Sequence, residues 1–148
     1  MAHAYVCNRH HIVFSTAGRR ELIRKNLQEP LWGYMAGIAK NHGMHALAIG
    51  GIENHVHLLL SLPSDMSEAK AVQVIKANSS RWMREQGVPG FSWQRGYGGF
   101  SVSASATDAV VHYIRTQREH HHKHSFEDEF RALLRKHGIT FREEEIFS

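Results

Sequence analysis

Two histidines separated by one residue are the side chains of this sequence best suited to chemistry. His55 and His57 flank Val56, and a run of three leucines follows. Side chains alternate between the two faces of a β-strand, so both imidazoles would point one way and Val56 the other. Imidazole nitrogens are common ligands of divalent metal ions. The segment therefore predicts a strand with two metal ligands on one face and a core on the other.

A tyrosine and a glutamine form a second candidate pair. Tyr113 and Gln117 lie four residues apart in a segment with helical periodicity. Residues at this spacing are neighbours on one face of a helix. Taken alone, the pair is typical of a half-buried tyrosine beside a polar residue. The combination of this pair with a preceding strand that carries two histidines is much less common, and it makes Tyr113 and Gln117 candidate site residues.

The elements around these residues predict an α+β fold of the ferredoxin-like (split βαβ) type. This fold is a four-stranded antiparallel sheet with helices on one face, and here a C-terminal helix would carry Tyr113. Because the leucines need the helices, we expect the histidines on the open face. Pro30 suits the first turn of its helix, and Ser67 can cap the next. The periodicity predicts strands over 10–16, 44–52, 55–62 and within 91–103, and helices over 21–42, 68–85, 105–122 and 126–137.

Composition indicates a soluble protein of one domain. The 148 residues are 42% hydrophobic and 22% charged, which is ordinary for a globular chain. We expect a single domain over 1–148, with 139–148 as a tail. Cys7 is the one cysteine, which rules out an internal disulfide. No signal peptide and no apolar run long enough for a membrane span is visible, so we expect a cytoplasmic protein with no membrane partner. The formal charge of +4 permits an anionic partner such as nucleic acid.

The ordered set of segments resembles a known family. It is similar to the single-tyrosine HUH transposases of the smallest bacterial insertion sequences and to the related REP-associated tyrosine transposases. A bare pair of histidines around one residue occurs in many enzymes, but the order and spacing of the whole set are specific. The matching segments are 11–16, 18–20, 55–57 with the leucine run, 93–103, 113–117 and 130–139.

The resemblance implies cleavage and rejoining of single-stranded DNA, with DNA hairpins among the partners. His55 and His57 would bind Mg²⁺ or Mn²⁺, with Gln117 as third ligand. Tyr113 would be the nucleophile, forming a 5′-phosphotyrosine link and releasing a 3′-hydroxyl. The family typically works as a homodimer, and whether the tyrosine acts in cis or in trans stays open. His120 or His121 could compete with Gln117, because they follow it by three and four residues.

Several positive and aromatic side chains could contact DNA, although a solvated helix surface explains single basic residues equally well. As a set, the basic residues could follow a phosphate backbone. Trp93 and Tyr97 could stack on bases, whereas Phe100 is better suited to the core. The candidate DNA-binding residues are Arg19, Arg20, Lys76, Arg81 and Arg95.

Other functions compete with the transposase. A non-catalytic nucleic-acid-binding module with a ferredoxin-like sheet is one, but the chain lacks the aromatic motif of RNA-recognition domains. A domesticated relative that acts on host repeats is another. A hydrolase whose histidines activate water is a third, but Glu53 is the only acidic residue beside the pair, and water activation usually needs a base.

Overall fold

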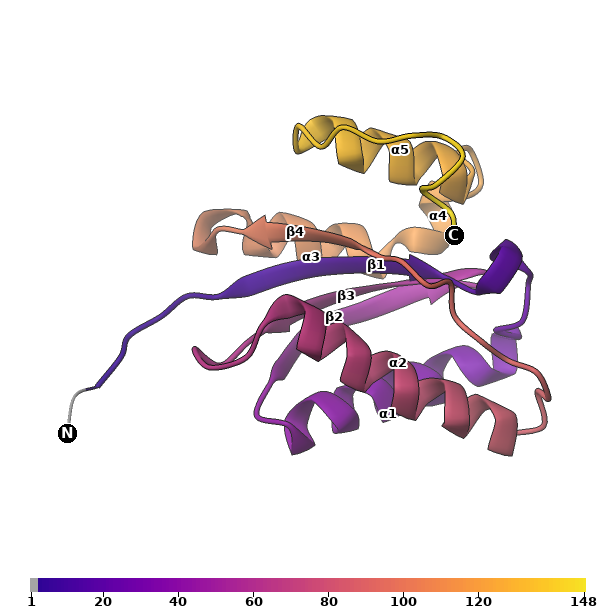
Figure 1. Ribbon diagram of the computed structural model, residues 1–148, viewed down its shortest axis with the longest axis horizontal. Helices are drawn as coiled ribbons and strands as arrows, with labels where there is room; N and C mark the ends of the chain where they lie inside the picture. The colour runs from indigo at the N-terminus through magenta and orange to yellow at the C-terminus, as the bar shows by residue number, and fades with distance from the viewer. Residues whose placement is uncertain (1–2) are drawn as a thin grey trace.

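The computed structural model describes residues 3–148 and contains a four-stranded antiparallel sheet between layers of helices (Figure 1). The strands are β1 (Arg9–Ser15), β2 (His45–Ile52), β3 (His55–Ser61) and β4 (Gly98–Val102). They lie side by side in the order β2-β3-β1-β4, and every neighbouring pair is antiparallel. This arrangement confirms the predicted ferredoxin-like fold.

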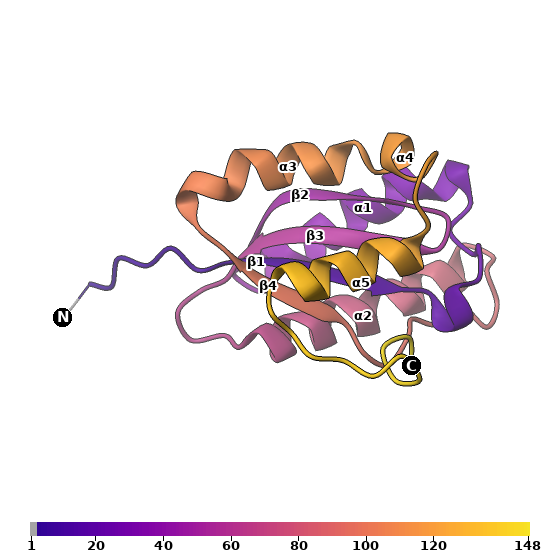
Figure 2. The same ribbon diagram turned by 90° about the horizontal axis from the view of Figure 1, so that it is seen from above.

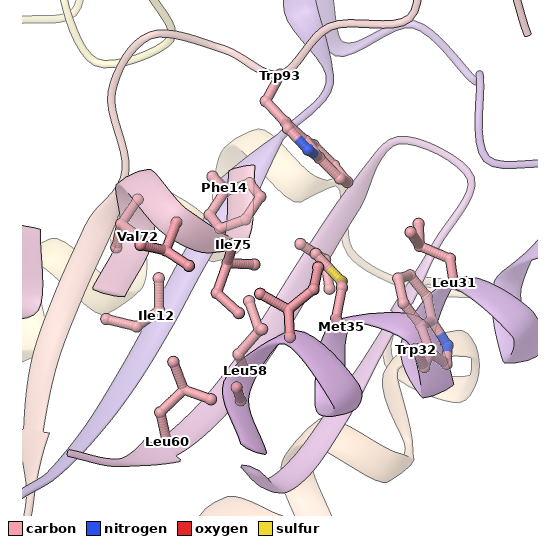
Figure 3. Close-up of a cluster of buried hydrophobic side chains, with 14 of the residues drawn as sticks. Ile12, Phe14, Leu31, Trp32, Met35, Leu58, Leu60, Val72, Ile75 and Trp93 are labelled. Atoms are coloured by element: carbon pink, nitrogen blue, oxygen red, sulfur yellow. The ribbon is translucent and has the colours of Figure 1, made fainter. Parts of the chain in front are cut away.

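Helices α1 (Lys25–Asn41) and α2 (Glu68–Glu85) cover one face of the sheet and form the main core with it. Leu58 and Leu60 of β3 point into this core, as the strand pattern predicts (Figure 3). The helix α2 has the predicted bounds, and the Ser67 hydroxyl caps it by accepting a hydrogen bond from the Lys70 amide at 3.1 Å.

Three further helices cover the opposite face, which was expected to be open. Their bounds are α3 (Thr107–Arg115), α4 (Gln117–His120) and α5 (Phe126–Lys136); short 3₁₀ turns at Ala17–Arg19 and Ala104–Ala106 complete the structure. Figure 2 shows α3 running along β2 and α5 lying over β1 and β4.

The open-face prediction is therefore wrong, because this face also carries large apolar side chains that need cover. Val13 and Phe100 pack against Phe126 and Phe130 of α5. Leu59 packs with Ile114 of α3. The histidines thus lie in a closed layer, and water reaches them only past the helices.

Pro30 occupies a different position from the predicted one. The helix α1 begins at Lys25, so Pro30 lies inside it, beyond its first turn. Leu27 and Leu31 on either side are both buried in the main core, so this part of the helix packs against the sheet although the proline lacks a backbone N–H. Within residues 3–148, no helix is both long and apolar enough to cross a membrane.

Gly50 of β2 lets α3 approach the sheet closely. A Cβ atom at this position would lie 2.5 Å from the backbone oxygen of Ile114. Gly50→Ala must therefore push α3 outward, and we expect it to destabilise the fold by about 1–3 kcal/mol. Gly33→Ala is the matched control, because nothing lies within 4 Å of its added Cβ and alanine favours a helix. Urea unfolding measures both; an unchanged midpoint in Gly50→Ala would show that α3 adjusts freely.

Candidate active site

Both histidines of β3 are fully buried, with 0% of either residue exposed. Antiparallel pairing sets Val13 opposite His57 and Ser15 opposite His55 on the same face of the sheet. Each ring has its Nδ1 atom engaged: that of His55 lies 2.8 Å from Asn54 Oδ1, and that of His57 lies 2.8 Å from His11 Nε2. These contacts orient the rings so that both Nε2 atoms face the helices.

Burial favours the neutral forms of His55 and His11, and a neutral imidazole is the form that binds metal. Burial lowers the pKa of His55 to about 4, against weaker opposing contacts with Glu129. It also lowers the pKa of His11 to about 3, and the neighbouring His57 adds to this shift. Sequence reasoning missed His11. The alternation of side chains along the first strand could have placed His11 on the same face of the sheet as the histidine pair. Only the pairing register of β1 with β3, however, brings it next to His57.

Removal of His11 tests its orienting role. We expect His11→Leu to weaken the binding of a divalent metal ion by the histidine pair by roughly 10–100-fold, because groups that orient a metal-binding imidazole have effects of this size. His10→Leu is the control, since His10 points the other way and contacts Glu68 at 2.6 Å. Metal affinity is compared for the two variants by calorimetry. Equal losses of metal affinity in His11→Leu and His10→Leu would show that His11 has no orienting role and only packs in the core.

The predicted helix over 105–122 is interrupted between the tyrosine and the glutamine. The helix α3 ends at Arg115, and Thr116 has φ −106° and ψ 26° before Gln117 begins α4. The Thr116 hydroxyl donates to the His112 carbonyl at 3.0 Å, a local bond that competes with regular helix. Gln117 is nevertheless buried, with its Oε1 atom 2.9 Å from His55 Nε2. The prediction of one continuous helix is therefore wrong, yet Gln117 reaches the histidine pair.

Glu129 of α5 joins these groups, and sequence reasoning missed it. Glu129 is only 4% exposed, and its carboxylate accepts hydrogen bonds from the Tyr113 hydroxyl and, at 2.9 Å, from Gln117 Nε2. Its Oε1 atom lies 3.1 Å from His57 Nε2. The sequence carried a signal: Glu129 lies at helical spacing from Phe126 and beside Phe130, on the apolar side of an amphipathic helix.

The charge on Glu129 governs the acidity of its neighbours. Burial raises the pKa of Tyr113 far above its usual value, and the adjacent carboxylate raises it further. Burial alone would also raise the pKa of Glu129, but attraction to His57 and hydrogen bonds from His121 and His55 outweigh it and hold that pKa far below its usual range. The carboxylate is therefore ionised, and the phenol stays protonated, when no cation is bound.

The two histidines that follow Gln117 also join the site. His121 Nε2 lies 3.0 Å from Gln117 Oε1 and 3.1 Å from Glu129 Oε1. His120 Nε2 lies 3.6 Å from Glu129 Oε2. Burial alone would lower the pKa of His121, but the hydrogen bond with Glu129 raises it. Gln117 stays beside His55, and His55, His121 and Glu129 each offer one atom that could bind a metal ion, all within 4.8 Å of one another.

A cavity of about 440 Å³ lies beside Tyr113, between α3 and α5. Tyr113, His120 and Glu129 line one part of it, and Lys136 and His137 line another. Its volume falls in the range of small-ligand sites and can hold one nucleotide. The nucleophile candidate is thus reachable from solvent although the histidine pair is buried.

The candidate DNA-binding residues occupy varied environments. Arg19 pairs with Glu127 at 3.3 Å, and Lys76 donates to the carbonyls of Gln94 and Gly96 at 2.7 Å each. Arg81 lies 4.0 Å from Glu85, while Arg20 and Arg95 are exposed.

Of the aromatic candidates, two are in the core. Trp93 is buried and donates to the Ser79 hydroxyl at 2.9 Å, so the prediction that it stacks on bases is wrong. Phe100 packs in the core as expected, stacked on His137 with ring centroids 4.3 Å apart. Tyr97 is half-buried.

The fold, an antiparallel sheet with a tyrosine helix over its histidine face, is that of the tyrosine transposases. A transposase structure from Deinococcus radiodurans R1 superposes with a TM-score of 0.62 at 22% identity, covering 79% of this chain and 96% of that one. A REP-associated tyrosine transposase bound to a REP hairpin gives a TM-score of 0.61 at 17% identity, covering 82% of this chain and 73% of that one. At these identities the likeness concerns the fold alone.

Residues 4–117 match the family model described as "Transposase IS200 like". The match spans well over half of the chain, and the chain belongs to this family. It ends at Gln117, so α5 and Glu129 lie outside the matched part. Comparison with curated proteins finds no match.

Proposed function

We propose that this chain is a metal-dependent transposase that cleaves and rejoins single-stranded DNA through a 5′-phosphotyrosine intermediate. The observation that carries the proposal is the meeting of four side chains inside one chain. Tyr113 contacts Glu129, and the same carboxylate contacts His57 and Gln117. A nucleophile thus lies against a set of metal ligands, in a chain that belongs to a transposase family.

The donor set suits a divalent ion. His55 and His57 present their Nε2 atoms, and Gln117 presents an amide oxygen. We propose Mg²⁺ or Mn²⁺, which when bound would withdraw charge from a phosphate oxygen and orient the phosphate. The Tyr113 hydroxyl attacks phosphorus, a Tyr–O–P bond forms, and the bond to the 3′-oxygen breaks. Glu129 Oε2 accepts the hydrogen bond of the hydroxyl and orients it for attack. The hydroxyl proton passes to solvent in the adjoining cavity, and the released 3′-oxygen takes a proton from solvent. Attack by a 3′-hydroxyl reverses the step without ATP.

Substrate and assembly follow as proposals. A solved relative is bound to a REP hairpin, which supports hairpin-containing single-stranded DNA as the substrate of this chain. Within one chain the rings of Tyr113 and His57 lie 5.7 Å apart, which supports cleavage in cis. The strand β4 is at an edge of the sheet and could pair with a second copy in a homodimer. With cellular DNA as substrate, we expect the reaction in the cytoplasm.

End-labelled DNA tests the proposal. The chain is incubated with Mg²⁺ or Mn²⁺ and a hairpin-containing single strand labelled at either end, and the products are separated on a denaturing gel. A 3′ label should become attached to the protein, whereas a 5′ label should be released on a free fragment. Attachment of the 5′ label would contradict the stated polarity. Cleavage without attachment would favour a hydrolase, and binding without cleavage would favour the non-catalytic module.

A further inference from the structure

The carboxylate of Glu129 lies among atoms of the kinds that bind cations, and His121 contributes one of them. Its Nδ1 atom lies 2.7 Å from the carbonyl oxygen of His124, which can only accept, so Nδ1 carries a proton and Nε2 is the ring atom that faces the site. This Nε2 atom lies 3.0 Å from Gln117 Oε1 and 3.1 Å from Glu129 Oε1. One nitrogen and two oxygens thus converge at the spacing that ligand atoms take around one cation.

The spacing of the donors matches the spacing around a metal ion. Ligand atoms in adjacent octahedral positions around Mg²⁺ lie about 3 Å apart. His55 Nε2 lies 2.9 Å from Gln117 Oε1 and 3.3 Å from Glu129 Oε1. His57 Nε2 lies 3.1 Å from the same Glu129 atom. That oxygen is therefore the common neighbour of the imidazoles, and it carries the one negative charge in the group.

We propose that Glu129 and His121 are metal ligands that complete the site begun by the strand histidines and Gln117. The inference rests on the proposed function but extends it, because both residues lie beyond the matched part of the family. It makes α5 a part of the catalytic centre, since Glu129 holds the metal through Oε1 and the Tyr113 hydroxyl through Oε2. The helix thereby sets the distance between nucleophile and metal.

The completed donor set also selects among metals. An anionic oxygen neutralises part of the ion's charge, and imidazoles favour softer ions than the hydrated, oxygen-bound Mg²⁺. A site with several imidazoles and one carboxylate should therefore bind Mn²⁺ more tightly than Mg²⁺. Removal of Glu129 should weaken the binding of both ions.

Calorimetric titration of the full chain with Mn²⁺, without DNA, tests the proposal. We expect Glu129→Gln and His121→Ala each to weaken Mn²⁺ binding by roughly tenfold or more, since each removes a ligand. Glu127→Ala is the matched control: it removes a carboxylate from the same helix, where Glu127 contacts Arg19 rather than the histidines. It should bind Mn²⁺ within about twofold of the natural chain. If both ligand variants bind Mn²⁺ as the natural chain does, the proposal is overturned.

A substitution can change the stability of the fold as well as metal binding, and thermal unfolding separates these two effects. Each variant is melted with and without Mn²⁺, and only the shift caused by the ion is compared. A ligand that binds the folded state alone raises the melting temperature, so the shift should shrink in Glu129→Gln and stay in Glu127→Ala. Tyr113→Phe should keep the full shift. If the shift is lost in Glu129→Gln, Glu129 is a metal ligand as proposed here. If the natural chain at the same time forms no DNA adduct, the proposed function is refuted although the metal site stands.

Discussion

Tyr113→Phe is expected to abolish the covalent DNA adduct and to reduce strand cleavage by roughly a thousandfold or more, because it removes the nucleophilic oxygen. The phenylalanine ring keeps the packing against His57 and His120, so the fold and hairpin binding should be retained. Adduct formation is measured on a denaturing gel, and binding by fluorescence anisotropy with the same labelled hairpin.

Tyr97→Phe is the control for this substitution. Tyr97 is also half-buried, but its neighbour is Glu68 rather than a histidine of the site. It should form the adduct at the natural rate. An adduct that persists in Tyr113→Phe and is lost in Tyr97→Phe would move the nucleophile to Tyr97.

His57→Ala should have the second largest effect. It removes an imidazole that meets Glu129 on one side and His11 on the other, and we expect cleavage to fall by roughly a hundredfold or more. Hairpin binding should persist, because the His57 ring is fully buried and leaves the protein surface unchanged when it is removed. Cleavage rates are measured across a series of Mg²⁺ and Mn²⁺ concentrations.

His45→Ala provides the comparison, because His45 is an exposed imidazole at the start of the neighbouring strand β2. Its cleavage rate and its metal requirement should equal those of the natural chain. Removal of metal by a chelator should stop the natural chain and His45→Ala alike. Full cleavage by His57→Ala in the presence of the chelator would refute a metal role for the pair.

Local patterns in the sequence were sufficient to predict the sheet and the first helical layer. The alternation around His55 and His57 predicted β3, and the opposite residues Leu58 and Leu60 do fill the core. Ser67 marked the start of α2 correctly. These features depend on neighbours within a few residues, where strand and helix periods are readable.

The closed face of the sheet was not predictable in the same way. Glu129 lies 72 residues from its partner His57, and His11 lies 46 residues from it. Such pairs depend on the register of the strands and on the path of α5. The hydrophobic periodicity of a short segment contains no information about either. Thr116 also broke a helix whose pattern looked continuous, because its hydroxyl bonds to the backbone. Glu129 was therefore read as part of an ordinary amphipathic helix.

The central claim, that Tyr113 forms a covalent bond with DNA phosphate, is tested most directly by mass spectrometry of the adduct. The chain is reacted with the hairpin strand and metal, trimmed with nuclease and trypsin, and fragmented to locate the added nucleotide. The tryptic peptide 96–115 contains both Tyr97 and Tyr113, so fragmentation must separate them. We expect a nucleotide joined to Tyr113 through its 5′-phosphate. A nucleotide on Tyr97 or on any other residue, or DNA cleaved with no modified peptide, would contradict it.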